Sequence, residues 1–423
     1  MEIKIHSYKE VDYQDKTVLL RLDINSPIDH DTGKITDTTR IKRSIPTLKH
    51  ILEQGAKIAI IAHQGDTLDY QNLGPLKEHA KELDNLLENH QVGYIDDVCG
   101  PSALEAVRNL QAGEAIILGN LRYLTEEVSV FETVVNITPQ EMTETWLIRK
   151  LATLFDVYVN DAFSAAHRYC ASMVGFQEVL PSVAGELFFS EYSTLSKVLH
   201  NAEKPCIFVL GGAKISDAFG MLKQVLEKGT ADKVLTTGVV GMIFLLANGQ
   251  ELGKQYMDFL KNKDFMQFVE PAKEYLEAYT NRIEMPLDVA FEKNSERVEV
   301  GIDQLPMDDV SFLDVGSETI EHYSNIIANA GTLFCNGPAG VYEEKLFENG
   351  TREIMKAVAN SNGYSVIGGG DSVQAAGKYV NLDDIDYVCT AGGAMVRFMT
   401  GETLPLVKAM EDNSEKILPL LKD

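Results

Sequence analysis

Hydrophobic residues in this chain gather in short runs rich in Val, Ile and Leu, and longer amphipathic stretches separate these runs. Such short runs are typical of strands buried on both faces, whereas apolar residues three or four positions apart are typical of surface helices. The runs predict strands at residues 17–22, 57–62, 115–118, 157–160, 206–210, 233–236, 311–314, 332–335, 364–367 and 387–389. The amphipathic stretches predict helices at residues 41–54, 72–89, 103–110, 144–155, 218–226, 317–330, 351–359 and 395–400.

This alternation of strands and helices predicts an α/β protein with doubly wound parallel sheets. A chain of 423 residues exceeds the usual size of one core and favours two domains. A helical pattern at residues 186–198 followed by a polar segment marks a boundary between them. We expect one lobe at residues 1–185, a hinge helix and linker at 186–204, and a second lobe at 205–400.

Composition narrows the class of ligand. The formal charge of −25 disfavours nucleic acids and anionic membranes as partners. The longest apolar stretch, residues 234–247, is too short to span a bilayer and predicts a buried helix. The N-terminus lacks a signal-peptide pattern, and the five cysteines are dispersed without CxxC spacing, which disfavours a zinc site. We therefore expect a cytoplasmic protein that acts on small molecules.

The most informative motif is Gly368-Gly369-Gly370-Asp371-Ser372, which lies between an apolar run and a helical pattern. Glycines let backbone N–H groups approach an anion closely, and the following helix N-terminus favours negative charge. Asp371 would repel a phosphate unless a divalent cation lies between them, and Mg²⁺ is commonly held by one or two carboxylates and substrate phosphates. The motif predicts a magnesium-nucleotide site, with a purely structural tight turn as the alternative.

Three further glycine turns follow predicted strands. They are Gly211-Gly212-Ala213-Lys214, Asn336-Gly337-Pro338-Ala339-Gly340, and Gly392-Gly393-Ala394. Lys214 adds positive charge beside a helix start, with a solvated surface lysine as the alternative, and Glu343 can accept hydrogen bonds from a ribose. Neither a Walker A loop nor GxGxxG is present. Because ligands bind beyond the carboxyl ends of parallel strands, four such turns in one sheet indicate a nucleotide site.

The N-terminal half instead places basic side chains at or near strand ends. These are Arg21, Arg40, His63, Arg122, His167 and Arg168. The planar guanidinium suits carboxylates and phosphates, so the set predicts a pocket for a small anionic substrate. For a single arginine a structural salt bridge is the alternative, and each histidine has the alternative of a hydrogen-bonded core residue.

A nucleotide site in one lobe and a cationic pocket in the other predict phosphoryl transfer, a reaction that depends on positioning and charge neutralisation. A carboxylate acceptor is already ionised at neutral pH and needs no general base. Because the sequence shows no catalytic loop of the kinase HRD type, an acyl-phosphate product is favoured.

These motifs, in this order, resemble the phosphoglycerate kinase family over nearly the whole chain. The matching segments are Arg21-Leu22-Asp23-Ile24-Asn25-Ser26-Pro27, Thr38-Thr39-Arg40-Ile41, Asn120-Leu121-Arg122, Asn160-Asp161-Ala162-Phe163 with His167-Arg168, and the four glycine turns. The single lysine of the Gly-Gly-Ala-Lys turn and the segment 237–242 look like the archaeal branch of the family.

The resemblance implies two similar-sized lobes and a segment 401–423 that returns to the first lobe. We expect a monomer or a homodimer. It implies transfer between MgATP or MgADP and 3-phosphoglycerate, with 1,3-bisphosphoglycerate as product. By this resemblance the phosphoglycerate is held by Asp23, Asn25, Arg40, His63, Arg122 and Arg168. Arg40, Lys214 and the backbone at Gly369 and Gly393 are implied to stabilise the moving phosphoryl group. The implied nucleotide contacts are Gly211, Gly212, Lys214, Glu343 for the ribose, Gly368, Gly369, Gly370, Asp371 for Mg²⁺, and Ser372 for a terminal phosphate.

The chain also departs from the family pattern. Asp66 stands where the family usually has a substrate-binding arginine, and Ala218 stands where many members have a second lysine. Other departures are Gly119, Ala391 and Met395. Asp66 leaves two alternatives open: a related kinase for a different small carboxylic acid, and a nucleotide-binding protein without catalysis.

Overall fold

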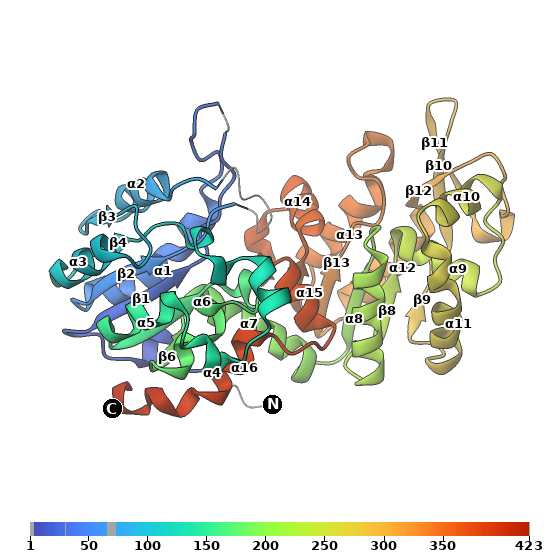
Figure 1. Cartoon of the computed structure of the whole chain (residues 1–423). Helices are drawn as coiled ribbons and strands as arrows, with labels where there is room; N and C mark the ends of the chain where they lie inside the picture. Colours follow the sequence, from blue (N-terminus) through green and yellow to red (C-terminus); the bar gives the residue numbers. More distant parts are fainter. Residues whose placement is uncertain (1–3, 30, 66–72, 423) are drawn as a thin grey trace. The chain divides into compact units, whose positions relative to one another are not determined.

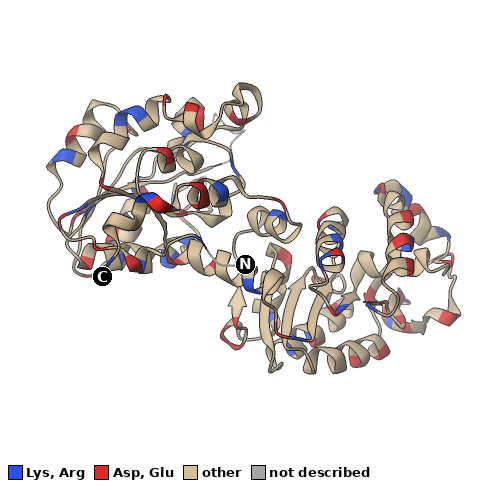
Figure 2. Cartoon of the chain, turned by 90° about the horizontal axis from the view of Figure 1, so that it is seen from below, with Lys and Arg blue, Asp and Glu red and all other residues tan. Residues whose placement is uncertain are grey.

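The computed structural model describes residues 4–29, 31–65 and 73–422. The chain divides into two compact units, one formed by Glu2–Ser193 with Thr403–Asp423 and the other by Thr194–Glu402. The division falls within helix α7 (Glu186–His200), the element expected to be the hinge. Acidic and basic side chains are interspersed over the helices of both units (Figure 2).

The first unit contains a six-stranded sheet of order β3-β4-β2-β1-β5-β6, in which every pair is parallel (Figure 1). Its strands are β1 (Thr17–Leu22), β2 (Lys57–Ile61), β3 (Val92–Tyr94), β4 (Ala115–Ile117), β5 (Val157–Asp161) and β6 (Ser182–Ala184). Val18, Leu19 and Leu20 of β1 are fully buried, as are Ile60 and Ile61 of β2. Burial along consecutive residues explains why these strands have continuous apolar runs.

The helices of the first unit include the predicted ones and three that were not predicted, at Pro139–Met142, Ala171–Val174 and Pro405–Asp412. They are α1 (Thr39–Glu53), α2 (Lys77–Leu86), α3 (Pro101–Asn109), α4 (Pro139–Met142), α5 (Trp146–Leu151), α6 (Ala171–Val174), part of α7, and α16 (Pro405–Asp412). The C-terminal segment lies against the start of the chain, where Leu421 forms an antiparallel bridge with Val11.

The second unit contains another parallel sheet, of order β15-β14-β13-β7-β8-β9. Its strands are β7 (Cys206–Leu210), β8 (Lys233–Thr236), β9 (Ile283–Glu284), β13 (Thr332–Asn336), β14 (Tyr364–Gly368) and β15 (Tyr387–Val388). Its helices are part of α7, α8 (Ile215–Glu227), α9 (Gly238–Ala247), α10 (Lys254–Asn262), α11 (Val269–Ala278), α12 (Ser317–Ala328), α13 (Asn349–Ala359), α14 (Gly370–Tyr379) and α15 (Gly393–Met399). The predicted class, two doubly wound parallel α/β domains, is confirmed.

Several predicted elements need correction. The strand predicted at 311–314 is β12 (Phe312–Val315), and it belongs to a separate antiparallel sheet with β10 (Asp288–Lys293) and β11 (Glu296–Gly301). The helix predicted at 144–155 ends at Leu151 and continues as a 3-10 turn. The apolar stretch 234–247 is divided between β8 and α9. The helix predicted at 72–89 is α2, and Asn72 lies outside the described residues.

Candidate active site

The four glycine turns all follow strands of the second unit's parallel sheet, as predicted. They follow β7, β13, β14 and β15, which are neighbours in the strand order. Asn336 at the end of β13 is in register with Leu210 of β7 and with Gly368 of β14. Three of the turns therefore begin at the same level of one sheet edge.

Two of these glycines are required by close approach of the backbone. Gly337 has φ +92°, and a Cβ atom there would overlap the backbone of Gly211 in the neighbouring turn. Gly369 has φ +90°, and a Cβ atom there would lie 2.7 Å from the side-chain amide nitrogen of Asn336. Any larger residue would push the turns apart, because an L-residue with a positive φ is strained as well.

The turns line a cavity of about 550 Å³. Gly211, Gly212, Lys214, Gly369, Gly370, Asp371, Ser372 and Gly393 all contribute to its wall. The predicted nucleotide residues Gly368 and Glu343 are not among its lining residues. Gly368 is the last residue of β14, and its carbonyl accepts a hydrogen bond from the Asn336 amide at 2.9 Å.

Lys214 and Asp371 form an ion pair in this cavity, with 3.0 Å between Lys214 Nζ and Asp371 Oδ2. Both side chains are more than half exposed, so the pair contributes little to stability and either partner is accessible to a ligand. Ser372 is buried, and its hydroxyl oxygen accepts a hydrogen bond from the Gly337 N–H at 2.6 Å. This hydroxyl therefore links the turns after β13 and β14.

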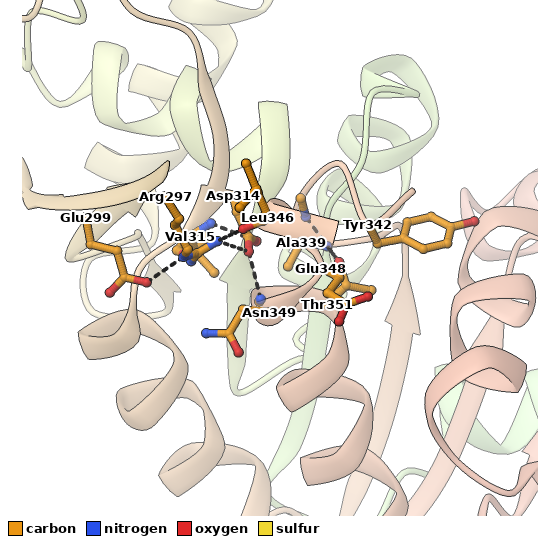
Figure 3. Close-up of polar contacts among 12 residues, drawn as sticks. Arg297, Glu299, Asp314, Val315, Ala339, Tyr342, Leu346, Glu348, Asn349 and Thr351 are labelled. Carbon is orange, nitrogen blue, oxygen red and sulfur yellow. Dashed lines mark hydrogen bonds and ion pairs between the residues drawn. The ribbon is translucent and has the colours of Figure 1, made fainter. Parts of the chain in front are cut away.

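A second cavity, of about 290 Å³, shares Gly212 and Asp371 with the first. Glu343 lies on its wall, and its apolar residues are Val239, Met242, Phe312 and Val341 among others. Asp314 also lines this cavity and forms an ion pair with Arg297 at 2.9 Å (Figure 3).

Arg297 and Asp314 hold the antiparallel sheet against the neighbouring loop. Arg297 also donates to the carbonyls of Leu346 and Val315, at 3.0 and 2.8 Å (Figure 3). Burial raises the pKa of Asp314 to about 6, although its hydrogen bond from Gly350 N–H and the Arg297 charge act to lower it.

In the first unit, the four predicted arginines lie near His63. The pKa of His63 is lowered well below its usual value, first by burial and then by the positive charges of Arg21, Arg122, Arg40 and Arg168. Arg21 is buried, and its Nη2 lies 2.7 Å from His63 Nδ1. The imidazole is consequently neutral and serves as a hydrogen-bonding group within a positively charged cluster.

Asp23 and Arg40 form an ion pair at one side of this cluster. Arg40 Nη1 lies 2.8 and 3.0 Å from the two oxygens of Asp23, and Asp23 Oδ2 also accepts a 2.6 Å hydrogen bond from the Ser164 hydroxyl. Asp23 is buried, whereas the Arg40 side chain is 41% exposed, so Arg40 remains accessible. Asn25 Oδ1 accepts a hydrogen bond from Gly65 N–H at 3.1 Å.

Arg122 and Arg168 are held by the segment between β4 and α4. Arg122 donates to the carbonyl of Glu127 at 2.7 Å, and burial lowers its pKa. Arg168 Nε lies 2.8 Å from Glu132 Oε1, on a π-helical turn at Phe131–Val135. Asp66 lies outside the described residues.

Sequence reasoning missed several polar residues of these sites, namely Ser164, Glu127, Glu132 and Arg397. Glu132 lies 36 positions from its partner Arg168 and belongs to no recognisable motif. Arg397 was detectable, because it lies four residues, about one helical turn, after Gly393.

Among the described residues, no helix is both long and apolar enough to cross a membrane. Within the same residues, no group of three or more His, Cys, Asp and Glu side chains is arranged to hold a metal ion.

The fold and these two sites define a two-domain α/β protein with a glycine-lined cavity in one unit and a cluster of arginines near a buried histidine in the other. A sequence model of the family described as "Phosphoglycerate kinase" matches residues 8–402. The chain belongs to this family of phosphotransferases.

Similar proteins match this chain over nearly its full length. Phosphoglycerate kinase of Methanothermus fervidus is 41% identical over 97% of both chains, and that of Methanococcus maripaludis is 43% identical over 96% of this chain and 98% of its own. The crystal structure of phosphoglycerate kinase from Pyrococcus horikoshii OT3 covers 97% of this chain and 100% of its own, with 37% identity and a TM-score of 0.83. These relatives are archaeal, so the predicted likeness to the archaeal branch is confirmed.

Proposed function

We propose that this chain transfers the terminal phosphoryl group of MgATP to the carboxylate of 3-phosphoglycerate, and catalyses the reverse reaction. The observation that carries this proposal is the grouping of Arg21, Arg40, Arg122 and Arg168 near His63 in a chain that matches the family from residue 8 to residue 402. Four guanidinium groups near one neutral imidazole can bind a small, highly charged acid in competition with internal carboxylates such as Glu132.

In the first unit, Arg40, Arg122, Arg168, His63, Asp23 and Asn25 are the proposed phosphoglycerate residues. Arg40 would act on the transferred group as well, because its side chain is 41% exposed while Asp23 holds one of its guanidinium nitrogens. Neutral His63 can donate or accept a hydrogen bond without adding charge. The acceptor carboxylate is already ionised near neutral pH, so the cluster needs no general base.

In the second unit, the 550 Å³ cavity is the proposed phosphate site and the 290 Å³ cavity the proposed nucleoside site. Lys214 and the backbone N–H groups of Gly369, Gly370 and Gly393 would contact phosphate oxygens. The apolar wall of the smaller cavity suits a purine base, and Glu343 on that wall would accept hydrogen bonds from the ribose.

The residues present fit Mg²⁺. Asp371 is a half-exposed carboxylate on the walls of both cavities, where a cation would meet the phosphates of a nucleotide. One carboxylate with substrate phosphates and waters is a usual environment for this ion. When bound, Mg²⁺ supplies positive charge that neutralises the phosphates. Lys214 would then exchange its contact with Asp371 for one with the nucleotide.

We retain the proposal that residues 186–204 form a hinge and that the protein is a monomer or a homodimer. A different acceptor acid or a loss of catalysis, the alternatives raised by Asp66, gains no support from the relatives described above.

The direct test is a coupled assay in which purified protein, MgATP and 3-phosphoglycerate generate 1,3-bisphosphoglycerate for a reducing dehydrogenase. We expect turnover that requires all three components. Absence of turnover, in a protein that still binds MgADP in calorimetry, would overturn the proposed reaction and leave the nucleotide site standing.

A further inference from the structure

Arg397 is a second cation on the wall of the 550 Å³ cavity. It belongs to helix α15 and lines the cavity together with Val396 and Thr400 of the same segment. Lys214, at the start of α8, also lines this cavity. The helices α8 and α15 pack closely, since a Cβ atom on Gly220 would lie 2.7 Å from the Thr400 side chain.

The cavity wall carries more acidic than basic side chains. Its acidic residues are Asp217, Asp371 and Glu402, and its basic residues are Lys214 and Arg397. Lys214 is paired with Asp371. Within the described part of the chain, the Arg397 guanidinium has neither an ion-pair nor a hydrogen-bond partner, whereas the Arg397 carbonyl accepts hydrogen bonds from Glu402 N–H and the Thr400 hydroxyl.

An exposed arginine without a partner is common on protein surfaces, but this one faces a cavity walled by glycines. A nucleoside diphosphate brings several negative charges to that cavity, where three carboxylates already share the wall with Lys214, so binding calls for a further positive charge on the wall. The side chain at position 218, one turn after Lys214, is a buried alanine, so α8 offers no second basic group to the cavity wall. Arg397 is therefore the basic side chain on this wall that can supply positive charge beside Lys214.

We propose that Arg397 is a phosphate-binding residue of the nucleotide site, where it supplies a second positive charge beside Lys214. This inference rests on the proposed function in one respect, namely that the cavity takes a nucleotide. It does not depend on the identity of the acceptor acid.

Calorimetry of the full chain with MgADP and with adenosine tests the inference. Loss of a charge-assisted hydrogen bond predicts about tenfold or greater weakening of MgADP binding in Arg397→Gln. Adenosine, which has no phosphate, should bind Arg397→Gln and the unchanged protein equally. Arg397→Lys should restore only part of the lost MgADP affinity, because lysine keeps the positive charge but lacks the planar guanidinium group.

Lys223→Gln is the matched control, because Lys223 is an exposed cation on α8 that does not line the cavity. It should bind MgADP as the unchanged protein does. Equal MgADP affinity in Arg397→Gln and Lys223→Gln would overturn the inference, as would equal losses for MgADP and adenosine. A protein that binds MgADP through Arg397 yet shows no turnover with 3-phosphoglycerate would refute the proposed reaction alone.

Discussion

Arg168 is neutralised from within the chain by Glu132. The Nε and Nη2 atoms of the guanidinium both contact Glu132 Oε1, at 2.8 and 2.5 Å, and both side chains are four-fifths or more buried. The Ser129 hydroxyl accepts a third hydrogen bond from Arg168 at 2.8 Å. A substrate phosphate that binds Arg168 must therefore compete with an internal carboxylate.

Replacing Glu132 with glutamine should strengthen substrate binding. The variant keeps a hydrogen-bonding side chain but removes the competing charge, so we expect the KM for 3-phosphoglycerate to fall about fivefold with kcat nearly unchanged. Glu144→Gln is the control, since Glu144 is 76% exposed and its partner is Arg149. A rise in KM would mean instead that Glu132 positions Arg168 for the substrate.

Arg40→Lys should reduce kcat by about 100-fold, the usual effect of losing one donor that stabilises developing charge. Lysine keeps the positive charge but lacks the planar guanidinium, so it cannot contact both oxygens of Asp23 and a phosphoryl group at the same time. Initial rates with both substrates saturating measure the effect. Arg108→Lys, at an exposed position on α3, should leave kcat unchanged. If Arg40→Lys also kept the kcat of the unchanged protein, a role of Arg40 in the chemical step would be excluded.

Most strands and helices of the parallel sheets were predictable, because strands buried on both faces carry unbroken apolar runs. The strands that were missed are short or partly exposed. β3 and β6 have three residues each, too few to establish a periodicity, and β11 alternates charged residues with valine and has no fully buried position. The antiparallel sheet was missed because β12 has the same composition as the parallel strands.

The site was predictable to the extent that parallel topology brings strand ends together. The glycine turns and the basic residues follow strands, so their clustering required only the correct strand order. Pairs such as Arg168 with Glu132, or Arg40 with Asp23 and Ser164, depend on side-chain packing between distant segments. Single-sequence patterns contain no information on such contacts.

Asp66→Arg should improve the use of 3-phosphoglycerate. If Asp66 occupies the family's usual arginine position in the substrate pocket, the change removes a repelling charge and adds a bidentate donor. A contact of this kind predicts a KM about tenfold lower. Asp258→Arg makes the same charge change at an exposed position of α10 and should leave the KM as it is. An unchanged KM in Asp66→Arg would show that the side chain at position 66 does not contact the substrate.

The buried Asp314 should give the stability of the second unit a specific pH dependence. Burial raises its pKa to about 6 in the folded protein, against about 3.9 for an unfolded chain. Between these values the folded protein holds a proton that the unfolded chain has released, so this residue's contribution to the free energy of unfolding falls as pH rises from about 4 to about 6. Urea unfolding across this range should show the decline in the unchanged protein and a shallower one in Asp314→Asn. The exposed Asp309→Asn should follow the unchanged protein, and identical slopes for all three would contradict a raised pKa at Asp314.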